Sequence, residues 1–198
     1  MQVHKRDPRS EIVAAAAGLL DRYGIADLTM RRLARDLALT PGALYWHFAS
    51  KQQLLGAVAD RLLAPVADTA DPAGWRDRIE VLCLRLRDAL LSHTDGAELV
   101  AASHAAGQSV AVTELVDRLA VAAADAGFSP AHAELAARTV LYYVLGFTVD
   151  EQSRRQWDAA GSALPPQAAP AADPDRQFAF GLNLVIDGLA AHRRVPVS

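Results

Sequence analysis

The fold of this chain is constrained most by two short stretches in which apolar residues recur at helical spacing. A break of about three residues separates the two stretches. The first runs from Thr29 to Leu37, and the second runs from Thr40 to Phe48. In each stretch the threonine can accept a hydrogen bond from a free backbone N–H of the first turn, and apolar side chains fall on one face. A preceding helix is predicted over residues 12–23. Three helices in this order, the last two joined by a tight turn, form a helix-turn-helix.

The rest of the chain also has helical patterns and few β-branched runs. Hydrophobic residues, mostly alanine and leucine, make up 52% of the chain and aromatic residues 6%, which favours helices over sheets. The first helix can begin at an Asp7-Pro8 cap or at Ser10. Ser50 and Gln53 form a capping box, in which each satisfies a free backbone donor of the other. Helices are further expected over residues 50–63, 75–92, 98–104, 113–126, 130–155 and 175–192. The predicted fold class is therefore all-α.

The charge distribution divides the chain after Lys51. Residues 1–51 hold 8 Lys and Arg against 5 Asp and Glu, whereas residues 52–198 hold 12 against 18. A basic part before an acidic remainder indicates a polyanion partner for the first part only. We expect a helix-turn-helix domain in the first part and a second helical domain in the other. Within the second domain, residues 65–74 are expected to form a polar connection, and residues 158–174, rich in proline and alanine, a flexible loop.

The segment TPGALYWHF at residues 40–48 places ring side chains where they cannot all be buried. Leu44 and Phe48 lie one turn apart on the inner face, so Tyr45 and His47 point outward. There a phenol and an imidazole can bond phosphate oxygens or base edges. Packing inside the domain is the alternative for such rings, and we expect Trp46 to be half buried.

Other residues around this segment fit the same use. Ala43 can contact a thymine methyl group, and Gly42 lets the backbone come close. Lys51 lies near the N-terminus of the next helix, where free N–H groups attract a phosphate. Arg31 reaches the same groove face, whereas Arg32 is left without an assigned role.

The segment LTMRRLARDLALTPGALYWHFASKQQLL, residues 28–55, resembles the DNA-binding domain of the TetR family of transcriptional regulators. The resemblance implies an all-α homodimer in which three N-terminal helices bind DNA and further helices hold a ligand pocket and the dimer interface. Two departures stand out. Ala38 replaces a glycine of the family, which costs on the order of 1 kcal/mol if its backbone is left-handed. Pro41 replaces a polar base-reading residue of the antibiotic repressors, so their operator sequence is not carried over.

Carried over position by position, the resemblance assigns the DNA contacts to nine residues. These are Arg31, Thr40, Pro41, Gly42, Ala43, Tyr45, Trp46, His47 and Lys51.

Residues 89–100, 144–152 and 178–189 resemble, more weakly, the C-terminal domain of the tetracycline repressors within this family. In those repressors a histidine ligates the Mg²⁺ ion of the bound drug, and here that position is Val100. A hard cation needs oxygen or imidazole donors, so a magnesium–tetracycline ligand is not expected.

The neighbouring positions support the same conclusion. In those repressors, polar residues of the helix matching residues 75–92 contact the antibiotic. The matching residues here are Leu82 and Leu86, which are apolar. Asp150 and Glu151 match the acidic pair of the partner subunit that supports the metal in the relative, but two carboxylates without the histidine make a weak site. Whether they bind any metal stays open.

The resemblance therefore implies a ligand-responsive repressor that binds a pseudo-palindromic DNA operator as a homodimer and is released by a small, mostly apolar effector. No cofactor and no metal are expected. Gly181 and Gly188, two turns apart, indicate the close approach of another helix, which suits a dimer seam. The predicted effector pocket is lined by Leu82, Leu86, Val100, Ser103, His104, Val116 and Phe147.

Two other classes of function fit the sequence less well than a repressor. The sequence contains no G-x-S-x-G, C-x-x-C, P-loop or H-E-x-x-H motif, which disfavours an enzyme. A helical scaffold that binds another protein is allowed by the composition, but it has no need of the charge division or of the outward rings.

Single residues and the chain ends indicate the compartment. Cys83 has no partner for a disulfide and is expected to be a buried thiol. His93, His104 and His132 are too scattered for a metal site, and each is expected at the surface or in a hydrogen bond. Neither a membrane span nor a signal peptide is expected, so a cytoplasmic protein is predicted.

Overall fold

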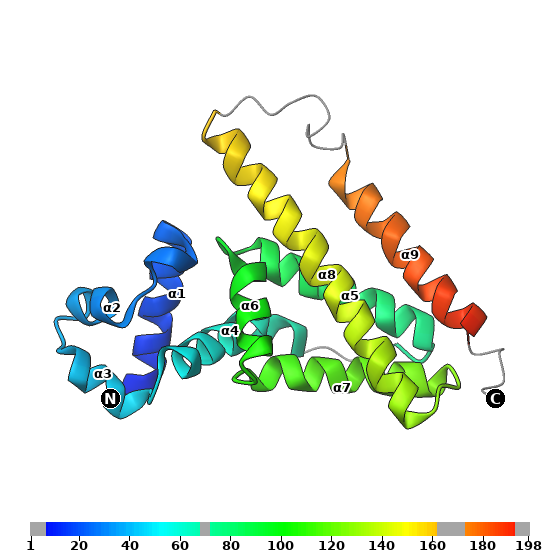
Figure 1. Ribbon diagram of the computed structural model, residues 1–198, viewed down its shortest axis with the longest axis horizontal. Coiled ribbons are helices and arrows are strands. Elements are labelled where there is room, and N and C mark those ends of the chain that lie inside the picture. The colour runs from blue at the N-terminus through cyan, green and yellow to red at the C-terminus, as the bar shows by residue number, and fades with distance from the viewer. Residues whose placement is uncertain (1–6, 68–71, 162–172, 193–198) are drawn as a thin grey trace, which may run out of the picture.

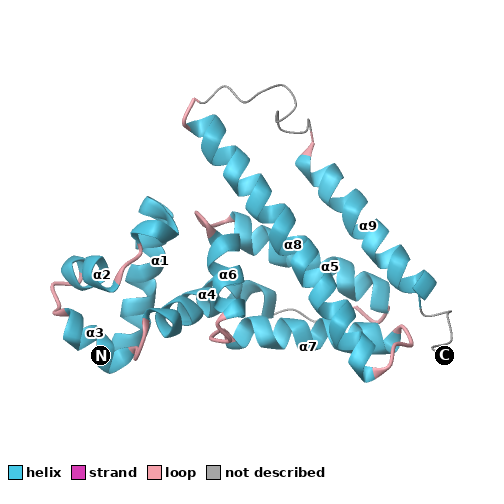
Figure 2. Cartoon of the chain, in the orientation of Figure 1, coloured by secondary structure: helices cyan, strands magenta, loops and turns pink. Residues whose placement is uncertain are grey.

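The computed structural model describes residues 7–67, 72–161 and 173–192 of the chain. Within these residues the chain forms helices and no strand, as Figures 1 and 2 show. The predicted all-α class is confirmed. The helices are α1 (Pro8–Asp27), α2 (Met30–Asp36), α3 (Pro41–His47), α4 (Lys51–Ala67), α5 (Trp75–Leu91), α6 (Gly96–Ala105), α7 (Val110–Asp125), α8 (Pro130–Ala159) and α9 (Pro174–His192).

The first helix begins at the Asp7 cap. The Asp7 carboxylate accepts a hydrogen bond from the Arg9 N–H at 3.2 Å, and Pro8 occupies the first helical position, where its missing N–H has no helical acceptor in any case. At Gly24 the backbone leaves helical geometry, with φ 77° and ψ 173°, and one further turn continues to Asp27. The predicted stop at Gly24 is thus a kink inside α1.

The start of α4 follows the predicted capping box in one half only. The Ser50 hydroxyl accepts a hydrogen bond from the Gln53 N–H at 3.2 Å, as expected. The Gln53 side chain, however, accepts from the N–H of Ala49 and not from that of Ser50. At the other end, α4 continues through Pro65 to Ala67, although a connection was predicted from residue 65. The extra turn buries Val66 in the core. Pro65 has no N–H to donate to the carbonyl four residues earlier, which belongs to the exposed residue Arg61.

Several of the later helices begin earlier or end later than predicted. α7 begins at Val110 because the Ser109 hydroxyl caps it, accepting from the Val112 N–H at 3.2 Å. α6 begins two residues before and ends one residue after the predicted range 98–104. α8 runs to Ala159, so the predicted loop begins later than expected. Residues 162–172 of that loop lie outside the described residues.

Two apolar clusters organise the molecule. One joins the inner faces of α1, α2 and α3 to α4, where it includes Leu54, Val58 and Leu62. The other joins the second half of α4, at Leu63 and Val66, to α5–α9. In Figure 1, α1–α3 lie together at one end and α4 leads from them into the remaining helices. α4 is therefore shared by both clusters, and the predicted domain boundary after residue 51 stays a prediction.

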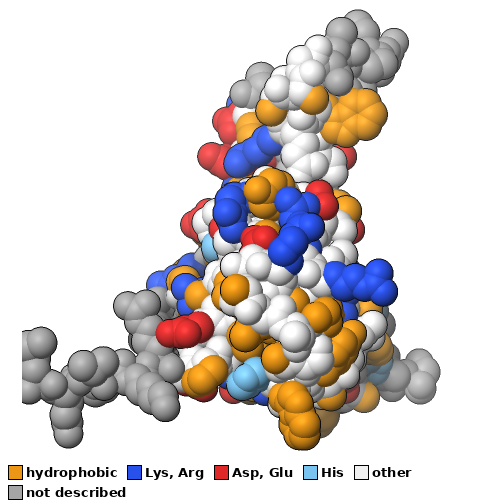
Figure 3. Space-filling model, turned by 90° about the vertical axis from the view of Figure 1, so that its left-hand side faces the viewer, with side chains coloured by type: hydrophobic (Ala, Val, Ile, Leu, Met, Phe, Trp, Pro, Cys, Tyr) orange, Lys and Arg blue, Asp and Glu red, His pale blue; other side chains and the backbone are white. Residues whose placement is uncertain are grey.

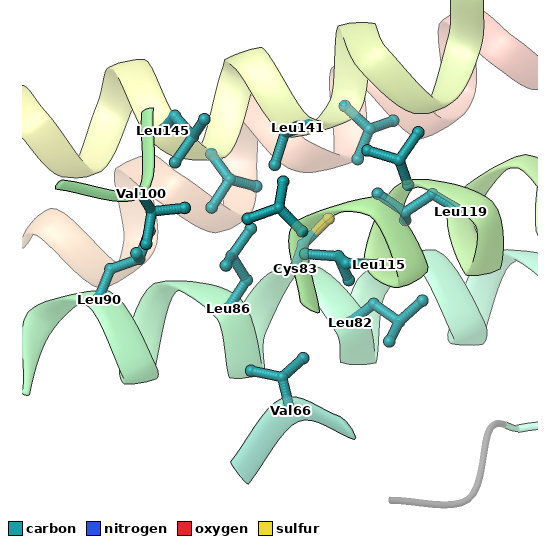
Figure 4. Packing of buried hydrophobic residues seen from close by; sticks show 14 of the residues in the cluster. Val66, Leu82, Cys83, Leu86, Leu90, Val100, Leu115, Leu119, Leu141 and Leu145 are labelled. Carbon is teal, nitrogen blue, oxygen red and sulfur yellow. The ribbon is translucent and has the colours of Figure 1, made fainter. Parts of the chain in front are cut away.

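The larger cluster is close-packed around α5. Figure 4 shows side chains of α5, α7 and α8 meeting at Leu86, Leu115 and Leu141, each at most 3% exposed. Cys83 lies among them as a buried free thiol, as the sequence predicted. Burial, with a smaller contribution from the charge of Glu80, raises the pKa of this thiol far above its usual value. The thiol is therefore protonated and unreactive.

A buried ion pair ties α5 to α8 and α9. The Arg87 guanidinium donates two hydrogen bonds of 3.0 Å to Glu151, and both side chains are almost fully buried. A third bond, of 2.7 Å, reaches Asp175 in the first turn of α9. Burial alone would lower the pKa of Arg87, but the bonds to Asp175 and Glu151 raise it above its ordinary value. Arg87 thus holds three helices together as a permanent cation.

Candidate nucleic-acid interface

The turn between α2 and α3 is fixed by backbone hydrogen bonds. The Leu39 N–H donates to the Ala34 carbonyl at 2.8 Å, and the Ala38 N–H donates to the Arg35 carbonyl at 3.1 Å. This pattern is a Schellman motif, which places its central residue in the left-handed region. Ala38 has φ 53°, so the left-handed conformation considered from the sequence is present.

The short helix α3 presents its rings to solvent. The Thr40 hydroxyl caps it by accepting from the Ala43 N–H at 3.2 Å. Leu44 and Phe48 are fully buried, whereas Tyr45 is 51% and Trp46 90% exposed. The expectation that Trp46 would be half buried is therefore wrong.

The reason lies in the helix period. At 3.6 residues per turn, Trp46 stands two positions from both inner residues, Leu44 and Phe48, and so faces away from the core. The large rings of α3 are thus available for contact with another molecule.

Arg9 holds the end of α3 in place. Its Nη1 donates a 2.9 Å hydrogen bond to the His47 carbonyl, one of the carbonyls that the end of a helix leaves unpaired. Its guanidinium carbon lies 4.3 Å from the centre of the buried Phe48 ring. Nothing in the sequence pattern indicated this contact, because 38 positions separate the two hydrogen-bonded residues.

Cationic side chains surround the same surface. Figure 3 shows Lys and Arg side chains gathered across the end of the molecule that α1–α3 form, with hydrophobic and histidine side chains beside them. Arg31 and Arg35 on α2 are exposed, and Lys51 is half-buried at the first position of α4. Arg32 instead lies 3.8 Å from the Tyr23 ring and pairs with Asp27, so its role is structural.

The nine residues assigned to DNA contact lie on three adjacent segments: α2, α3 with its cap, and the start of α4. None of them is buried. Six are exposed and three are half-buried, namely Ala43, His47 and Lys51. The assignment of individual DNA contacts stays a prediction.

The seven residues of the predicted effector pocket do not line one open space. Leu82, Leu86, Val100 and Val116 pack within the larger cluster and are at most 7% exposed. Figure 4 shows Val100 and Leu86 among the neighbouring core side chains.

The other three pocket residues lie in different surroundings. The Ser103 hydroxyl is buried and donates to the Leu99 carbonyl at 2.8 Å. His104 lines a cleft between α6 and α8. Phe147 lies on the α9 side of α8, with its ring 5.3 Å from that of Phe178. An effector among all seven residues would need space that the close-packed core lacks in this conformation.

The carboxylates considered for a metal are held by arginines. Asp150 pairs with Arg154 at 2.8 Å, and Glu151 is bonded by Arg87 and Arg155. In the described part of the chain, no three His, Cys, Asp or Glu side chains are grouped so that they could hold a metal ion.

Two of the remaining histidines lie in hydrogen bonds. His93 bonds Asp21 at 3.0 Å, and His132 bonds Ser129 at 3.0 Å, so both are hydrogen-bonded as predicted. Among residues 7–67, 72–161 and 173–192, no helix combines the length and apolar character that crossing a bilayer requires.

A polar contact links α1 to the opposite half of the molecule. Asp95, in the loop before α6, accepts a 2.9 Å hydrogen bond from the Ile25 N–H at the end of α1. Its other carboxylate oxygen accepts from the Gln156 side chain of α8. One residue earlier, the Thr94 hydroxyl donates to the Asp21 carbonyl at 3.0 Å. The position of α1 is therefore tied to the loop before α6 and, through Asp95, to α8.

A helix-turn-helix with exposed rings and surrounding cations, joined to a larger helical body, is typical of DNA-binding transcriptional regulators. Comparison with known proteins identifies the family. The sequence matches the family described as bacterial regulatory proteins, tetR family, over residues 12–58. It matches the tetracyclin repressor-like C-terminal domain over residues 69–172. The chain belongs to the TetR family.

Individual relatives agree with this membership. The tetracycline repressor protein class A from transposon 1721 of Escherichia coli is 32% identical over 199 residues, covering 93% of this chain and 91% of the relative. BioQ of Mycobacterium smegmatis superposes with a TM-score of 0.83 at 60% identity, covering 93% of this chain and 98% of BioQ. A structure of BioQ with its natural double-stranded DNA operator gives a TM-score of 0.78 at 57% identity, covering 96% and 100%.

A further solved relative holds a small molecule. A single-residue variant of TetR from Acinetobacter baumannii AYE, in complex with minocycline, has a TM-score of 0.76 at 31% identity and covers 96% of this chain and 100% of its own. Together these comparisons support the ligand-responsive, DNA-binding repressor predicted from the sequence.

Proposed function

We propose that this protein represses transcription by placing α3 of each protomer in the major groove of a pseudo-palindromic operator. The observation that carries the proposal is the outward face of α3, where Trp46 is 90% exposed and Tyr45 is 51% exposed beside exposed arginines of α2. Large exposed rings in a folded protein usually mark a binding surface. The 57% identity to BioQ, which was crystallised with its operator, supports a DNA partner.

The operator geometry follows from two copies of α3. For insertion into successive major grooves, the two recognition helices stand about 34–36 Å apart, which is one turn of DNA. The proposed dimer seam lies on α8 and α9, whose outer faces carry Leu135, Phe180 and Leu184 at 58–67% exposure. Burial of such an apolar face stabilises association.

The proposed effector is a small, mostly apolar molecule bound among the seven pocket residues named from the sequence. Because several of them are close-packed here, the bound state must separate α6 from α5 or α8. Such a ligand selects a conformer with a different spacing of the recognition helices, and a few kcal/mol of differential affinity lowers operator occupancy strongly. A cytoplasmic location, which access to DNA requires, belongs to the same proposal.

The test uses an operator obtained by selection from a library of random-sequence DNA duplexes. Tyr45→Ala should weaken operator binding by about 1.5–3 kcal/mol, roughly tenfold or more, because a hydrogen bond to a charged phosphate is lost. Thermal stability should stay nearly unchanged, since the ring is half exposed and outside the core. The matched control is Trp157→Ala, which removes another exposed ring at the far end of α8. Equal operator affinity for Tyr45→Ala and wild type, or failure to enrich any DNA, would count against the proposal.

Lys51 can be tested by the salt dependence of binding. Lys51→Ala should reduce the magnitude of the slope of log K against log salt by about 0.9, because one phosphate contact fewer releases one counterion fewer. Arg176→Ala, which removes an exposed cation on α9, should leave the slope unchanged. An unaltered slope for Lys51→Ala would remove Lys51 from the phosphate contacts.

A further inference from the structure

Arg9 joins the first turn of α1 to the end of α3, and Figure 1 shows these two segments beside each other. Its Nη1 donates a 2.9 Å hydrogen bond to the His47 carbonyl. Its guanidinium carbon lies 4.3 Å from the centre of the Phe48 ring, which is fully buried. A carbonyl and a ring face therefore hold the guanidinium at one place, where α3 ends.

Most of the hydrogen-bonding capacity of Arg9 is unused. A guanidinium has five N–H donors and stays charged in proteins, and one of these donors binds the His47 carbonyl. No carboxylate in the described part of the chain forms an ion pair with Arg9. Because Arg9 is exposed, its other donors and its uncompensated charge are accessible to another molecule.

The place of this charge fits the proposed DNA interface. His47 and Lys51, both assigned to DNA contact, lie one residue before and three residues after Phe48. Arg9 is bonded to the first of them and so lies at the edge where α3 ends and α4 begins. A guanidinium matches the geometry of phosphate oxygens. One that is already held in place loses little side-chain freedom when it binds.

We propose that Arg9 is a further DNA-contacting residue, whose guanidinium binds a backbone phosphate while one N–H stays bonded to the His47 carbonyl. The inference rests on the proposed function and deepens it, because it adds a residue of α1 to the nine assigned contacts. One planar group then joins a point on the DNA backbone to the end of α3. Since phosphate contacts fix register and orientation on the duplex, Arg9 also sets the position of α3 in the groove.

The experiment measures the affinity of the full-length protein for the selected operator at several salt concentrations. Arg9→Gln should weaken binding about tenfold or more at low salt, because a hydrogen bond to a charged phosphate is lost. The slope of log K against log salt should fall in magnitude by about 0.9 for each bound protomer.

The matched control is Arg22→Gln, near the other end of α1. Arg22 is also exposed, donates a 3.0 Å hydrogen bond to the Gly18 carbonyl and lies 5.5 Å from the Tyr23 ring. Its replacement removes the same charge from the same helix and should leave the salt slope unchanged.

A second variant separates the charge of Arg9 from its geometry. Arg9→Lys keeps the charge, so the salt slope should stay that of the wild type. Operator affinity should still fall roughly threefold or more, because an ammonium lacks the planar fork that holds a carbonyl and a phosphate at once. Thermal unfolding of each variant checks that binding is measured on folded protein.

If Arg9→Gln lowers operator affinity at an unchanged salt slope, Arg9 only supports α3 and the inference is overturned. Wild-type affinity of Arg9→Gln or of Arg9→Lys would overturn it as well. These results leave the proposed function standing where Tyr45→Ala still weakens operator binding. Failure of the wild-type protein to enrich any DNA would overturn both.

Discussion

At the residue scale, Ala38 shows how a backbone requirement can override a side-chain preference. The two hydrogen bonds of the turn after α2 hold this residue at φ 53°, a region in which a Cβ is strained. The sequence indicated the position, because alanine stands where the family has glycine. It did not indicate whether the turn would keep its left-handed geometry with alanine there, and the structure shows that it does.

Ala38→Gly should therefore raise the free energy of unfolding by up to about 1.6 kcal/mol. Relief of left-handed strain contributes about 1–2 kcal/mol, and the greater freedom of glycine in the unfolded chain offsets about 0.4–1 kcal/mol of it. The measurement is the urea midpoint at constant slope.

The matched control replaces a glycine of left-handed conformation with alanine. Gly107 has φ 63°, and a Cβ there would meet nothing within 4 Å, so Gly107→Ala should be destabilising by a similar amount. A lower midpoint for Ala38→Gly than for wild type would refute the strain argument.

At the scale of helices, the ion pair between α5 and α8 shows why the acidic pair of α8 could not be interpreted from its sequence. Asp150 and Glu151 are neighbours, but they lie on different faces of the helix. Asp150 is exposed, whereas Glu151 is buried against Arg87. The predicted weak metal site depended on both carboxylates facing one cation, and the helix turns them apart by about 100°.

Arg87→Met should lower the free energy of unfolding by about 3 kcal/mol, because Glu151 loses its buried partner and keeps only the exposed Arg155. The double variant Arg87→Met with Glu151→Met should recover much of this loss, since a buried pair can be replaced by apolar side chains at little cost. Chemical denaturation of the two single variants and the double variant measures the coupling. Strictly additive losses would show that the pair contributes no specific interaction.

For the whole molecule, the junction between α4 and the loop after α6 connects the end that α1–α3 form to the remaining helices. A Cβ at Gly56 of α4 would overlap the backbone carbonyl of Gln108. The two segments therefore touch through backbone atoms, and α4 contributes side chains to both apolar clusters. Together with the bonds of Asp95 to α1 and α8, this contact joins the segments on either side of α6 to α1 and α4 at two places.

Gly56→Ala should destabilise the protein by about 1–3 kcal/mol and weaken operator binding, because the added methyl group forces α4 away from the loop. Gly18→Ala in α1 is the matched control, since a Cβ there would meet nothing within 4 Å. That control should stabilise the protein by about 0.5–1 kcal/mol through helix propensity. Thermal unfolding and a gel shift measure both effects. If Gly56→Ala kept the thermal stability and operator affinity of the wild type, the loop at Gln108 would accommodate the methyl group without cost.

The glycines of α9 illustrate the limit of such arguments from sequence. Gly181 and Gly188 were expected together at a helix contact. A Cβ at Gly181 would overlap the Tyr143 hydroxyl of α8 within the same chain, whereas one at Gly188 would meet nothing within 4 Å. The spacing of the two glycines predicted that another helix packs closely against α9. It did not indicate whether that helix belongs to the same chain or to a second copy.

The sequence by itself determined what short-range interactions control. Caps such as Thr29 and Thr40, the inner pair Leu44 and Phe48, and the outward Tyr45 all depend on residues within one or two turns. These features identified the helix-turn-helix and, by resemblance, the family. Helix ends were predicted less well, as at Pro65, because the burial of a residue such as Val66 depends on distant helices.

Only the tertiary structure decided the contacts between distant positions. The bond from Arg9 to His47 spans 38 residues, that from Arg87 to Glu151 spans 64, and that from Ile25 to Asp95 spans 70. The same holds for Leu82 and Leu86, which could line a pocket or fill a core depending on how closely α5 approaches α8. The physical reason is that periodicity sets which face of a helix is apolar, whereas the packing of all helices together sets what that face touches.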